Sequence, residues 1–404
     1  MMQESAGSMS CRTIETRGTA TIYRTELGSR QVYVTAAVND NPDPVSATAD
    51  AYRAIADLLA EGGLQTVQER IFGALASHSQ ILEARAAALE AQAIASRTPL
   101  TYIQGRPLFG EGLAGVSLFA VRAEAPEDVW TIADADGTDH GRGWKCHDAT
   151  FLLLQDVHGR ADEPGADNSR AAQADRMFDR ADQLLRSQRR DYRSVTRTWV
   201  YLSEILDWYD EFNQVRSAKY GRFGLMPEAG QAGSNHLLLP ASTGIQGDTP
   251  RGAAVTMDVL ATEIPEGSPI EIRQMTNRRQ RDAFKYGSAF SRGAAIRMPE
   301  ATWISLSGTA SIDESGATLR VGDTRGQIQQ TFDVVEALIA QEGAALTDLC
   351  DATIFIKQAE DADVLAEVIA ERGLKELAGV RVVADVCRDD LLFEIDGAAV
   401  VQRG

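Results

Sequence analysis

Apolar residues recur along this chain at two different spacings, and the two spacings alternate. Between Gln327 and Gln341, four apolar residues are separated by four, three and four positions: Ile328, Phe332, Val335 and Ile339. That spacing places them on one face of an amphipathic helix. The next apolar run, from Ala352 to Lys357, is short and rich in β-branched residues, which is typical of a strand. The pattern therefore predicts a mixed fold of strands and helices.

The same order of elements occurs three times, with a period of roughly 130 residues, which indicates an internal repeat. In the third copy we expect a strand at Thr302–Gly308, the helix and strand just described, a second helix at Asp361–Glu371 and strands around Val382 and Phe393. In the second copy we expect helices at Ser169–Ser187 and Ile205–Lys219 and strands at Val195–Leu202, Leu237–Gly244 and Ala253–Leu260. In the fainter first copy we expect helices at Pro44–Glu61 and Ile81–Ile94 and strands at Gln68–Ala74 and Val116–Val121.

A β(β)αβαβ unit of this kind covers one face of its sheet with two helices, and its other face must also be buried. Three units in one chain can cover one another by packing around a common axis. We therefore predict an α+β fold of three tandem units, at residues 17–122, 128–262 and 270–404, packed as a pseudo-trimer. An unrelated α/β module in place of the first copy is the alternative.

Composition narrows the classes of ligand and compartment. The net charge of −18 argues against nucleic acid, because phosphate binding needs a basic surface. No apolar run reaches the roughly 18 residues of a membrane span, so we expect no membrane partner. Residues Met1 to Ser10 lack the basic and apolar regions of a secretory signal. A cytoplasmic protein is the expectation.

The cysteines and histidines do not form a recognisable metal or disulfide pattern. The four cysteines, at positions 11, 146, 350 and 387, include no C-x-x-C pair. Cys146 and His147 are the one adjacent Cys/His pair, and neighbours on a strand point to opposite faces. We expect reduced thiols, no metal site and no cofactor.

Candidate chemistry lies near the C-terminus, where one strand carries Arg381 and the next carries Glu394. An arginine suits a substrate carboxylate because its planar fork donates two parallel hydrogen bonds. A glutamate on an apolar strand suits proton transfer because partial burial raises its pKa toward neutrality. A surface arginine and a tolerated strand acid are the simpler interpretation.

The third copy resembles the Rid superfamily, the reactive intermediate deaminases related to YjgF, which are also called endoribonuclease L-PSP-like proteins. The resemblance is carried by Ser307-Gly308-Thr309-Ala310, Gly322-Asp323 with Gln327, the Thr353–Lys357 strand, and Arg381 with Glu394-Ile395-Asp396. It implies a chorismate mutase-like unit with ligand sites in the clefts between neighbouring units. It also implies that Arg381 binds a substrate carboxylate and that Glu394 activates the water that hydrolyses an imine or enamine.

The second and third copies together resemble the chorismatases, Rid relatives that hydrolyse the enol-ether of chorismate and release pyruvate. The matching segments include Arg197-Thr198-Trp199 with Tyr201, Tyr209 with Phe212-Asn213 and Arg216, Leu239–Ile245, Asn277 with Arg279-Gln280, Tyr286-Gly287, Phe290-Ser291-Arg292 and Asp390-Leu391-Leu392 with Glu394. Cys387 falls where some chorismatases place a cysteine and others an alanine. There are three departures: the chain carries a whole extra N-terminal unit, the glycine- and proline-rich piece of chorismatases around Tyr286-Gly287 is cut short, and Arg381 suits a deaminase.

The resemblance implies roles for eleven residues. Glu394 is the expected acid/base, and Cys387 shapes the catalytic pocket more plausibly than it acts as a nucleophile, because no histidine base is nearby. The expected substrate-binding residues are Arg381 and Arg292 as carboxylate clamps, Tyr201, Trp199, Tyr209 and Tyr286 as pocket walls, and Thr243 and Gly244, with Ser242, as oxyanion donors. Trp199 and Tyr201 are equally compatible with a core between units.

Three functions remain open at this point. The first is a chorismatase-like hydrolase acting on a small carboxylated enol-ether, and the second is an imine/enamine deaminase. Neither reaction requires a metal, because protonation of carbon or nitrogen creates the electrophile that water attacks. The third is a non-catalytic metabolite-binding or scaffold protein, suggested by site positions that look degenerate in the first two copies. A monomer is favoured, because three packed units close the ring without a partner.

Overall fold

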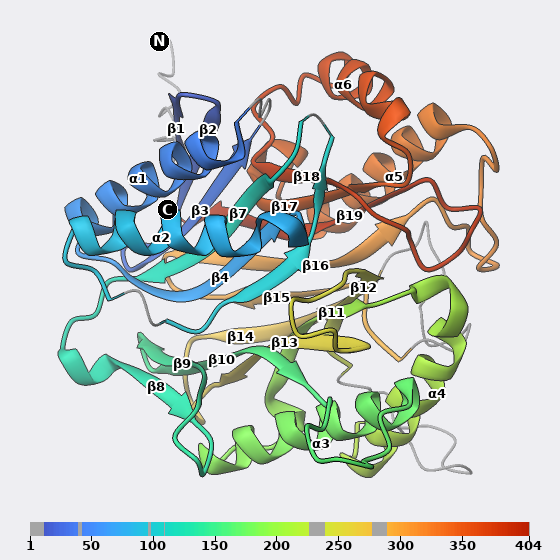
Figure 1. Cartoon of the computed structure of the whole chain (residues 1–404). Helices are drawn as coiled ribbons and strands as arrows, with labels where there is room; N and C mark the ends of the chain where they lie inside the picture. The colour runs from blue at the N-terminus through green and yellow to red at the C-terminus, as the bar shows by residue number, and fades with distance from the viewer. Residues whose placement is uncertain are drawn as a thin grey trace, which may run out of the picture.

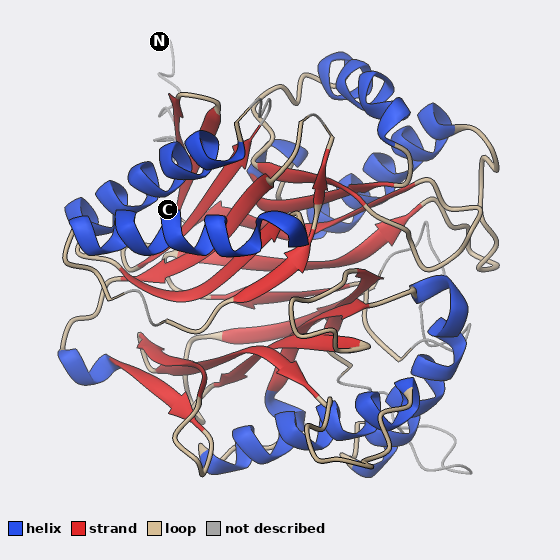
Figure 2. Cartoon of the chain, in the orientation of Figure 1, coloured by secondary structure: helices blue, strands red, loops and turns tan. Residues whose placement is uncertain are grey.

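The computed structural model describes residues 12–38, 43–95, 98–108, 110–225, 239–276 and 289–403. It contains three β-sheets, each covered on its outer face by two helices, and the inner faces of the sheets meet at the centre (Figures 1 and 2). The prediction of an α+β fold built from three similar units is confirmed. No helix in the described ranges has the length and apolarity needed to cross a bilayer.

Each unit is defined here by its sheet and its two helices. The first sheet has the order β1 (Arg12–Arg17), β2 (Ala20–Leu27), β3 (Gln31–Val38), β7 (Leu113–Val121), β4 (Gln65–Gly73) and β5 (Thr101–Gln104), with α1 (Pro44–Gly62) and α2 (His78–Ala91). The second has the order β12 (Ala241–Gln246), β11 (Val195–Leu202), β13 (Val255–Glu263), β10 (Ala149–His158), β9 (Asp139–Cys146) and β8 (Val129–Ala133), with α3 (Arg170–Ser187) and α4 (Ile205–Arg222). The third has the order β14 (Glu271–Met275), β15 (Gly293–Arg297), β16 (Ala301–Ala310), β19 (Phe393–Gln402), β17 (Leu349–Ile356), β18 (Gly379–Val383) and β6 (Arg106–Pro107), with α5 (Thr324–Ile339) and α6 (Ala362–Glu371).

The strand β6 comes from the first unit but extends the sheet of the third. It pairs antiparallel with β18, with Pro107 opposite Val382 and Arg106 opposite Val383. Proline has no backbone N–H and is therefore tolerated at a sheet edge. This exchange was not visible in the sequence pattern, because a two-residue strand has no periodicity.

Capping residues fix where the covering helices begin. The side chain of Asp43 accepts a hydrogen bond from Val45 N at the start of α1, and Ser169 and Asp323 accept from backbone N–H groups at the starts of α3 and α5. At the other end of α1, Gly63 has a φ of +58°, the left-handed conformation that glycine adopts without strain. The expected helix at Ile81–Ile94 starts earlier, at His78, and ends at Ala91.

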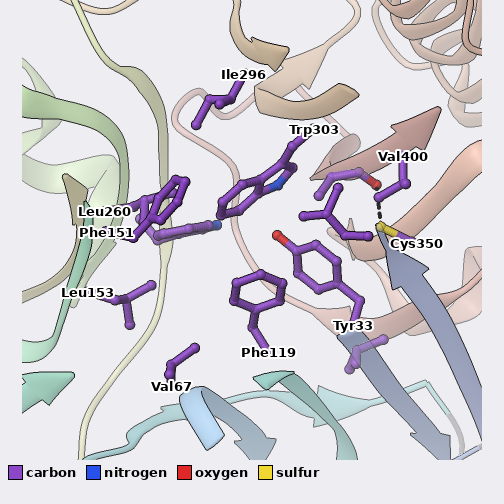
Figure 3. Packing of buried hydrophobic residues seen from close by; sticks show 14 of the residues in the cluster. Tyr33, Val67, Phe119, Phe151, Leu153, Leu260, Ile296, Trp303, Cys350 and Val400 are labelled. Atoms are coloured by element: carbon purple, nitrogen blue, oxygen red, sulfur yellow. Dashed lines mark hydrogen bonds between the residues drawn. The ribbon is translucent and has the colours of Figure 1, made fainter. Parts of the chain in front are cut away.

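The centre of the molecule is an apolar core to which all three sheets contribute. Tyr33 and Phe119 come from the first sheet, Trp144 and Phe151 from the second and Trp303 from the third (Figure 3). The ring centroids of Phe119 lie 5.1 Å from Trp303 and 5.7 Å from Trp144, distances at which aromatic edges and faces attract. Three further clusters fill the space between each sheet and its own helices.

A shared irregularity relates the three sheets residue by residue. The strand that lies between the two helices of each unit along the chain skips one residue in its pairing register: Val67 in β4, Thr196 in β11 and Cys350 in β17. Counting from these residues gives equivalent positions in the three units. The fifth residue onward is Phe72, Tyr201 and Phe355, and these pair with Gly115, Thr256 and Glu394, respectively.

Candidate active site

A pocket of about 430 Å³ lies between the second and third units. Helix α4 and strand β12 of the second unit form one side, and β16, β19 and the segments before β15 and β19 form the other (Figure 1). The pocket is lined by Tyr209, Asp210, Asn213, Gln214, Ser217, Ser242, Gly244, Phe290, Arg292, Gly308, Ala310, Ile312, Cys387, Arg388 and Glu394. Six of the eleven predicted site residues are among them: Tyr209, Ser242, Gly244, Arg292, Cys387 and Glu394.

Glu394 is the acidic group of the pocket that lies deepest in the protein. It is the second residue of β19, pairs with Ala310 of β16 and is only 4% exposed. Burial raises the pKa of its carboxyl to about 8, and the neighbouring Asp396 acts in the same direction, while Arg292 and Arg197 oppose the shift. At neutral pH the carboxyl therefore carries a proton, as a general acid must.

Gly308 makes room for this carboxyl. A Cβ at position 308 would lie 2.1 Å from Glu394 Oε1 and 3.3 Å from Thr243 Cγ2. Glycine is therefore needed here because of the close approach of the glutamate.

Two arginines line the same pocket. The Arg292 guanidinium is 2% exposed and lies 5.4 Å from the centroid of the Phe290 ring, which fixes its plane. Arg388 comes from the segment before β19 and donates to the Gly316 carbonyl at 2.7 Å. Sequence reasoning identified Arg292 and missed Arg388, although Arg388 directly follows the predicted Cys387.

One face of α4 forms the wall opposite Glu394. Its lining residues are spaced at helical intervals: Tyr209, Asp210, Asn213, Gln214 and Ser217. The helix is kinked at Trp208, whose φ of −147° is not helical and whose indole N–H donates to the Ser203 carbonyl. Tyr209 was predicted, and the polar residues after it were missed, because a polar helix face ordinarily faces solvent.

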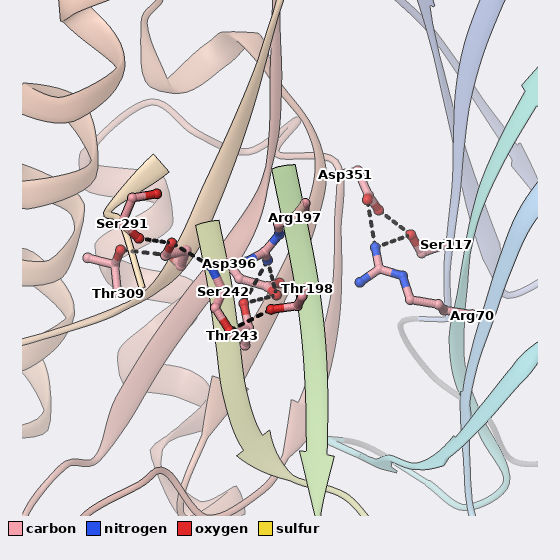
Figure 4. A network of polar contacts seen from close by, with 11 residues as sticks. Arg70, Ser117, Arg197, Thr198, Ser242, Thr243, Ser291, Thr309, Asp351 and Asp396 are labelled. Atoms are coloured by element: carbon pink, nitrogen blue, oxygen red, sulfur yellow. Dashed lines mark hydrogen bonds and ion pairs between the residues drawn. The ribbon is translucent and has the colours of Figure 1, made fainter. Parts of the chain in front are cut away.

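A buried polar network lies beneath the pocket (Figure 4). Arg197 of β11 donates from Nη2 to Asp396 Oδ2 at 3.0 Å and to Thr243 Oγ1 at 2.7 Å. Thr243 in turn donates to Asp396 Oδ2 at 2.6 Å. Thr243 is thus placed one layer below the pocket, as a support for Asp396, whereas Gly244 lines the pocket beside Tyr209.

Arg381 does not join Glu394 in this pocket, which corrects our expectation. Arg381 pairs with Ile354 of β17, and Glu394 pairs with the next residue, Phe355. Alternate residues of a strand point to opposite faces, so the two side chains lie on opposite faces of the third sheet. Arg381 instead lies toward the first unit, where its charge lowers the pKa of Tyr23 against the raising effect of burial.

Trp199 and Tyr201 belong to the central core, which is the second of the two places that the sequence left open for them. The indole of Trp199 lies between two guanidinium groups, 4.8 Å from Arg70 and 4.7 Å from Arg197. Tyr201 packs against Phe72 of the first unit, with ring centroids 6.3 Å apart. They share a face, as their spacing predicts, but this face meets the first unit.

Cys387 lines the pocket, and its partial burial raises the pKa of the thiol to about 12. A protonated thiol is a poor nucleophile, which fits a role in shaping the pocket. Tyr286 lies outside the described residues, as do Asn277, Arg279, Gln280 and Gly287 of the matching segments.

The equivalent positions differ between units. Gly115 and Thr256 occupy the place of Glu394 in the first and second units. Asp258 of the second unit is equivalent to Asp396, because it pairs with Trp199 as Asp396 pairs with Thr353.

Comparison with known proteins agrees with this geometry. Residues 282–401, nearly all of the third unit, match the family described as Endoribonuclease L-PSP. A chorismatase of Streptomyces hygroscopicus is 27% identical over 68% of this chain and 79% of its own length. The third unit thus resembles the Rid superfamily, and the chain is similar to the chorismatases over about two thirds of its length. A 3-hydroxybenzoate synthase of Streptomyces hygroscopicus is 26% identical over 70% of this chain and 84% of its own length.

A crystal structure of a chorismatase shares the fold, with a TM-score of 0.59 and 20% sequence identity, and the match covers 83% of this chain and 92% of the chorismatase. The second and third units make up only about two thirds of the chain. The structural match therefore extends into the first unit, which is not wholly additional to the chorismatase fold. That part of our comparison was wrong because the first copy has the faintest sequence pattern.

Proposed function

We propose that this protein is a hydrolase that cleaves the enol-ether of a small carboxylated ring compound such as chorismate, with release of pyruvate. The observation that carries the proposal is the burial of the Glu394 carboxyl, which raises its pKa to about 8, in a pocket that two arginines also line. The similarity to a chorismatase and to a 3-hydroxybenzoate synthase, both over more than three quarters of those proteins, supports the same class of substrate.

The chemistry begins with transfer of the Glu394 proton to the terminal carbon of the enol-ether. The double-bond electrons form the new C–H bond, and the ether carbon becomes an oxocarbenium ion. Water adds to that carbon and gives its proton to the Glu394 carboxylate, which restores the acid. The restored Glu394 acid then protonates the ring oxygen as the hemiketal breaks its C–O bond to that oxygen, and the hemiketal hydroxyl returns its proton to Glu394 as it becomes the ketone of pyruvate. Pyruvate and the ring alcohol then leave.

Arg292 and Arg388 are the proposed carboxylate clamps. Both line the pocket from the third unit, on the segments that precede β15 and β19. Two cations suit a dicarboxylate because each guanidinium can bind one carboxylate through paired hydrogen bonds. Arg388 thus takes the role that we expected of Arg381. The deaminase alternative required Arg381 and Glu394 to act together on one substrate. Their side chains project from opposite faces of the third sheet, so the structure does not support that alternative.

The test is the release of pyruvate from chorismate by the wild type, by Glu394→Gln and by Glu371→Gln. The last variant is a matched control, because Glu371 lies on the solvent-facing side of α6 and pairs with Arg325. We expect wild-type turnover, a loss of about 10²–10⁴-fold in kcat for Glu394→Gln, and turnover close to wild type for the control. A folded wild type that releases no pyruvate would overturn the proposal, and 2-iminobutyrate hydrolysis would then be measured.

A further inference from the structure

Two carboxylates lie side by side on the inner face of β19. Glu394 and Asp396 are two residues apart, so their side chains project from the same face of the strand. Asp396 is 1% exposed, and its Oδ1 has no hydrogen-bond partner among the residues that the structure describes. The charge of Asp396 beside the buried Glu394 carboxyl adds to the cost of ionising Glu394.

An arginine lies beneath these two carboxyls and bonds one of them. Arg197 is fully buried and bonds Asp396 directly, and Thr243 completes a ring of three hydrogen bonds with these two residues (Figure 4). Burial lowers the pKa of Arg197 to about 10, so it remains a cation at neutral pH. Its bond to Asp396 offsets this charge, which otherwise favours the ionised form of Glu394.

Other charged or titratable groups face Glu394 from each surrounding element: Arg197 on β11, Asp396 on β19, Arg292 before β15, Cys387 and Arg388 before β19, and Tyr209 and Asp210 on α4. Of these, Arg292 and Arg388 are the proposed substrate clamps. A bound dicarboxylate therefore neutralises their charges during turnover. The charges of Asp396 and Arg197 are then the charges near Glu394 that the bound substrate does not neutralise.

We propose that Asp396 is a positioning residue for the reaction, which keeps the proton on Glu394 by holding the positive charge of Arg197 away from it. The inference rests on the proposed role of Glu394 as the acid. Removing the Asp396 charge exposes Glu394 to an unopposed buried arginine, and a neighbouring cation favours the carboxylate. The acid would then be lost in the neutral pH range, although Glu394 itself is unchanged.

The decisive measurement is the titration of the Glu394 carboxyl, by NMR of protein labelled with ¹³C at the glutamate carboxyl carbon. Glu394→Gln identifies the signal by its disappearance. We expect Asp396→Asn to lower the midpoint by at least about one pH unit. Asp396→Ser is a second variant in case the asparagine does not fold, because serine occupies the equivalent position in the first unit, as Ser117.

The matched control is Asp351→Asn. Asp351 is also a buried aspartate that bonds an arginine across a unit boundary, with Arg70 Nη2 at 2.7 Å, but it lies on β17 and serves the first unit. The Asp351→Asn variant should lower the stability of the fold as Asp396→Asn does. It should leave the midpoint of the Glu394 titration within about a third of a pH unit of the wild type. An unchanged midpoint in the Asp396 variants, or an equal shift in Asp351→Asn, would overturn the inference.

Activity separates this inference from the proposed function. If the wild type turns over chorismate, the high-pH limb of kcat in the Asp396 variants should move down by the same amount as the titration midpoint. A purely structural defect would lower kcat equally at every pH. If the wild type does not turn over chorismate, the proposed function fails, and the titration still decides how Asp396 acts on Glu394.

Discussion

Arg381 and Glu394 pair with adjacent residues of β17 and therefore project from opposite faces of the third sheet. The first prediction follows from this relationship. Replacing Arg381 with Met should change KM and kcat for chorismate by less than about threefold, because the side chain lies outside the pocket. Arg292→Met should raise KM at least tenfold, since a charge-assisted bond contributes about 1.5–3 kcal/mol. Steady-state kinetics of the two variants, with thermal melts to confirm folding, checks the contrast. Equal losses in both variants would contradict it.

The pH profile gives the second prediction. Glu394 must be protonated to act as an acid, and the pKa of its carboxyl is about 8. Activity should therefore be retained through neutral pH and fall as pH rises through about 8, the direction opposite to that of a general base. The profile of kcat against pH, in buffers of constant ionic strength, measures this limb. A limb that rises with pH in this range would assign Glu394 the role of a base.

The third prediction concerns the space beside Glu394. Gly308→Ala should reduce kcat by an order of magnitude or more, because the added methyl group overlaps Oε1 and displaces the carboxyl. Gly221→Ala is the control, because no atom lies within 4 Å of an added Cβ at that helical position. The control should keep wild-type activity and gain slightly in stability. Retained activity in Gly308→Ala would show that the glutamate has room to move.

Asp258 gives a fourth prediction, on stability. Its carboxyl is fully buried between the first two units, accepts from Thr101 Oγ1 and the Asp156 N–H, and has a pKa raised by burial to about 6. A carboxyl whose pKa rises on folding stabilises the fold below its unfolded pKa, and that contribution is lost as pH rises through the folded value. The wild type should therefore lose up to about 3 kcal/mol between pH 4 and pH 7 through this group.

Asp258→Asn should remove that slope. Urea unfolding at the two pH values measures the difference, and the variant should gain stability relative to the wild type at pH 7 and not at pH 4. A variant with the same pH dependence as the wild type would show that Asp258 is not the group responsible.

The arrangement of elements could be predicted from the sequence because it depends on local patterns. The expected strand at Val195–Leu202 coincides with β11, and the amphipathic spacing around Phe332 marks α5 within three residues at each end. The alternation along β19 was also visible, with Phe393 and Ile395 facing the helices and Glu394 and Asp396 facing inward.

The errors arose where a side chain's position depends on a neighbouring unit. Arg381 alternates with Val380 and Val382, which are in the central core, so its own side chain points the other way. The sequence contains that alternation but does not state which face holds the pocket. Likewise, Trp199 and Tyr201 share a face, yet only the packed structure shows that this face meets Arg70 and Phe72. Arg388 lacked any periodic signal, because it lies in a connecting segment.

The three equivalent positions hold Glu394, Thr256 and Gly115, which has a consequence for how such a protein can change over evolutionary time. In an assembly of identical subunits, one codon change alters every cleft at once, and a substitution that harms any cleft is repeated around the ring. With three units encoded in one reading frame, each cleft can mutate alone. One cleft can then retain proton-transfer chemistry while the other two lose it and accumulate the residues that best hold the units together.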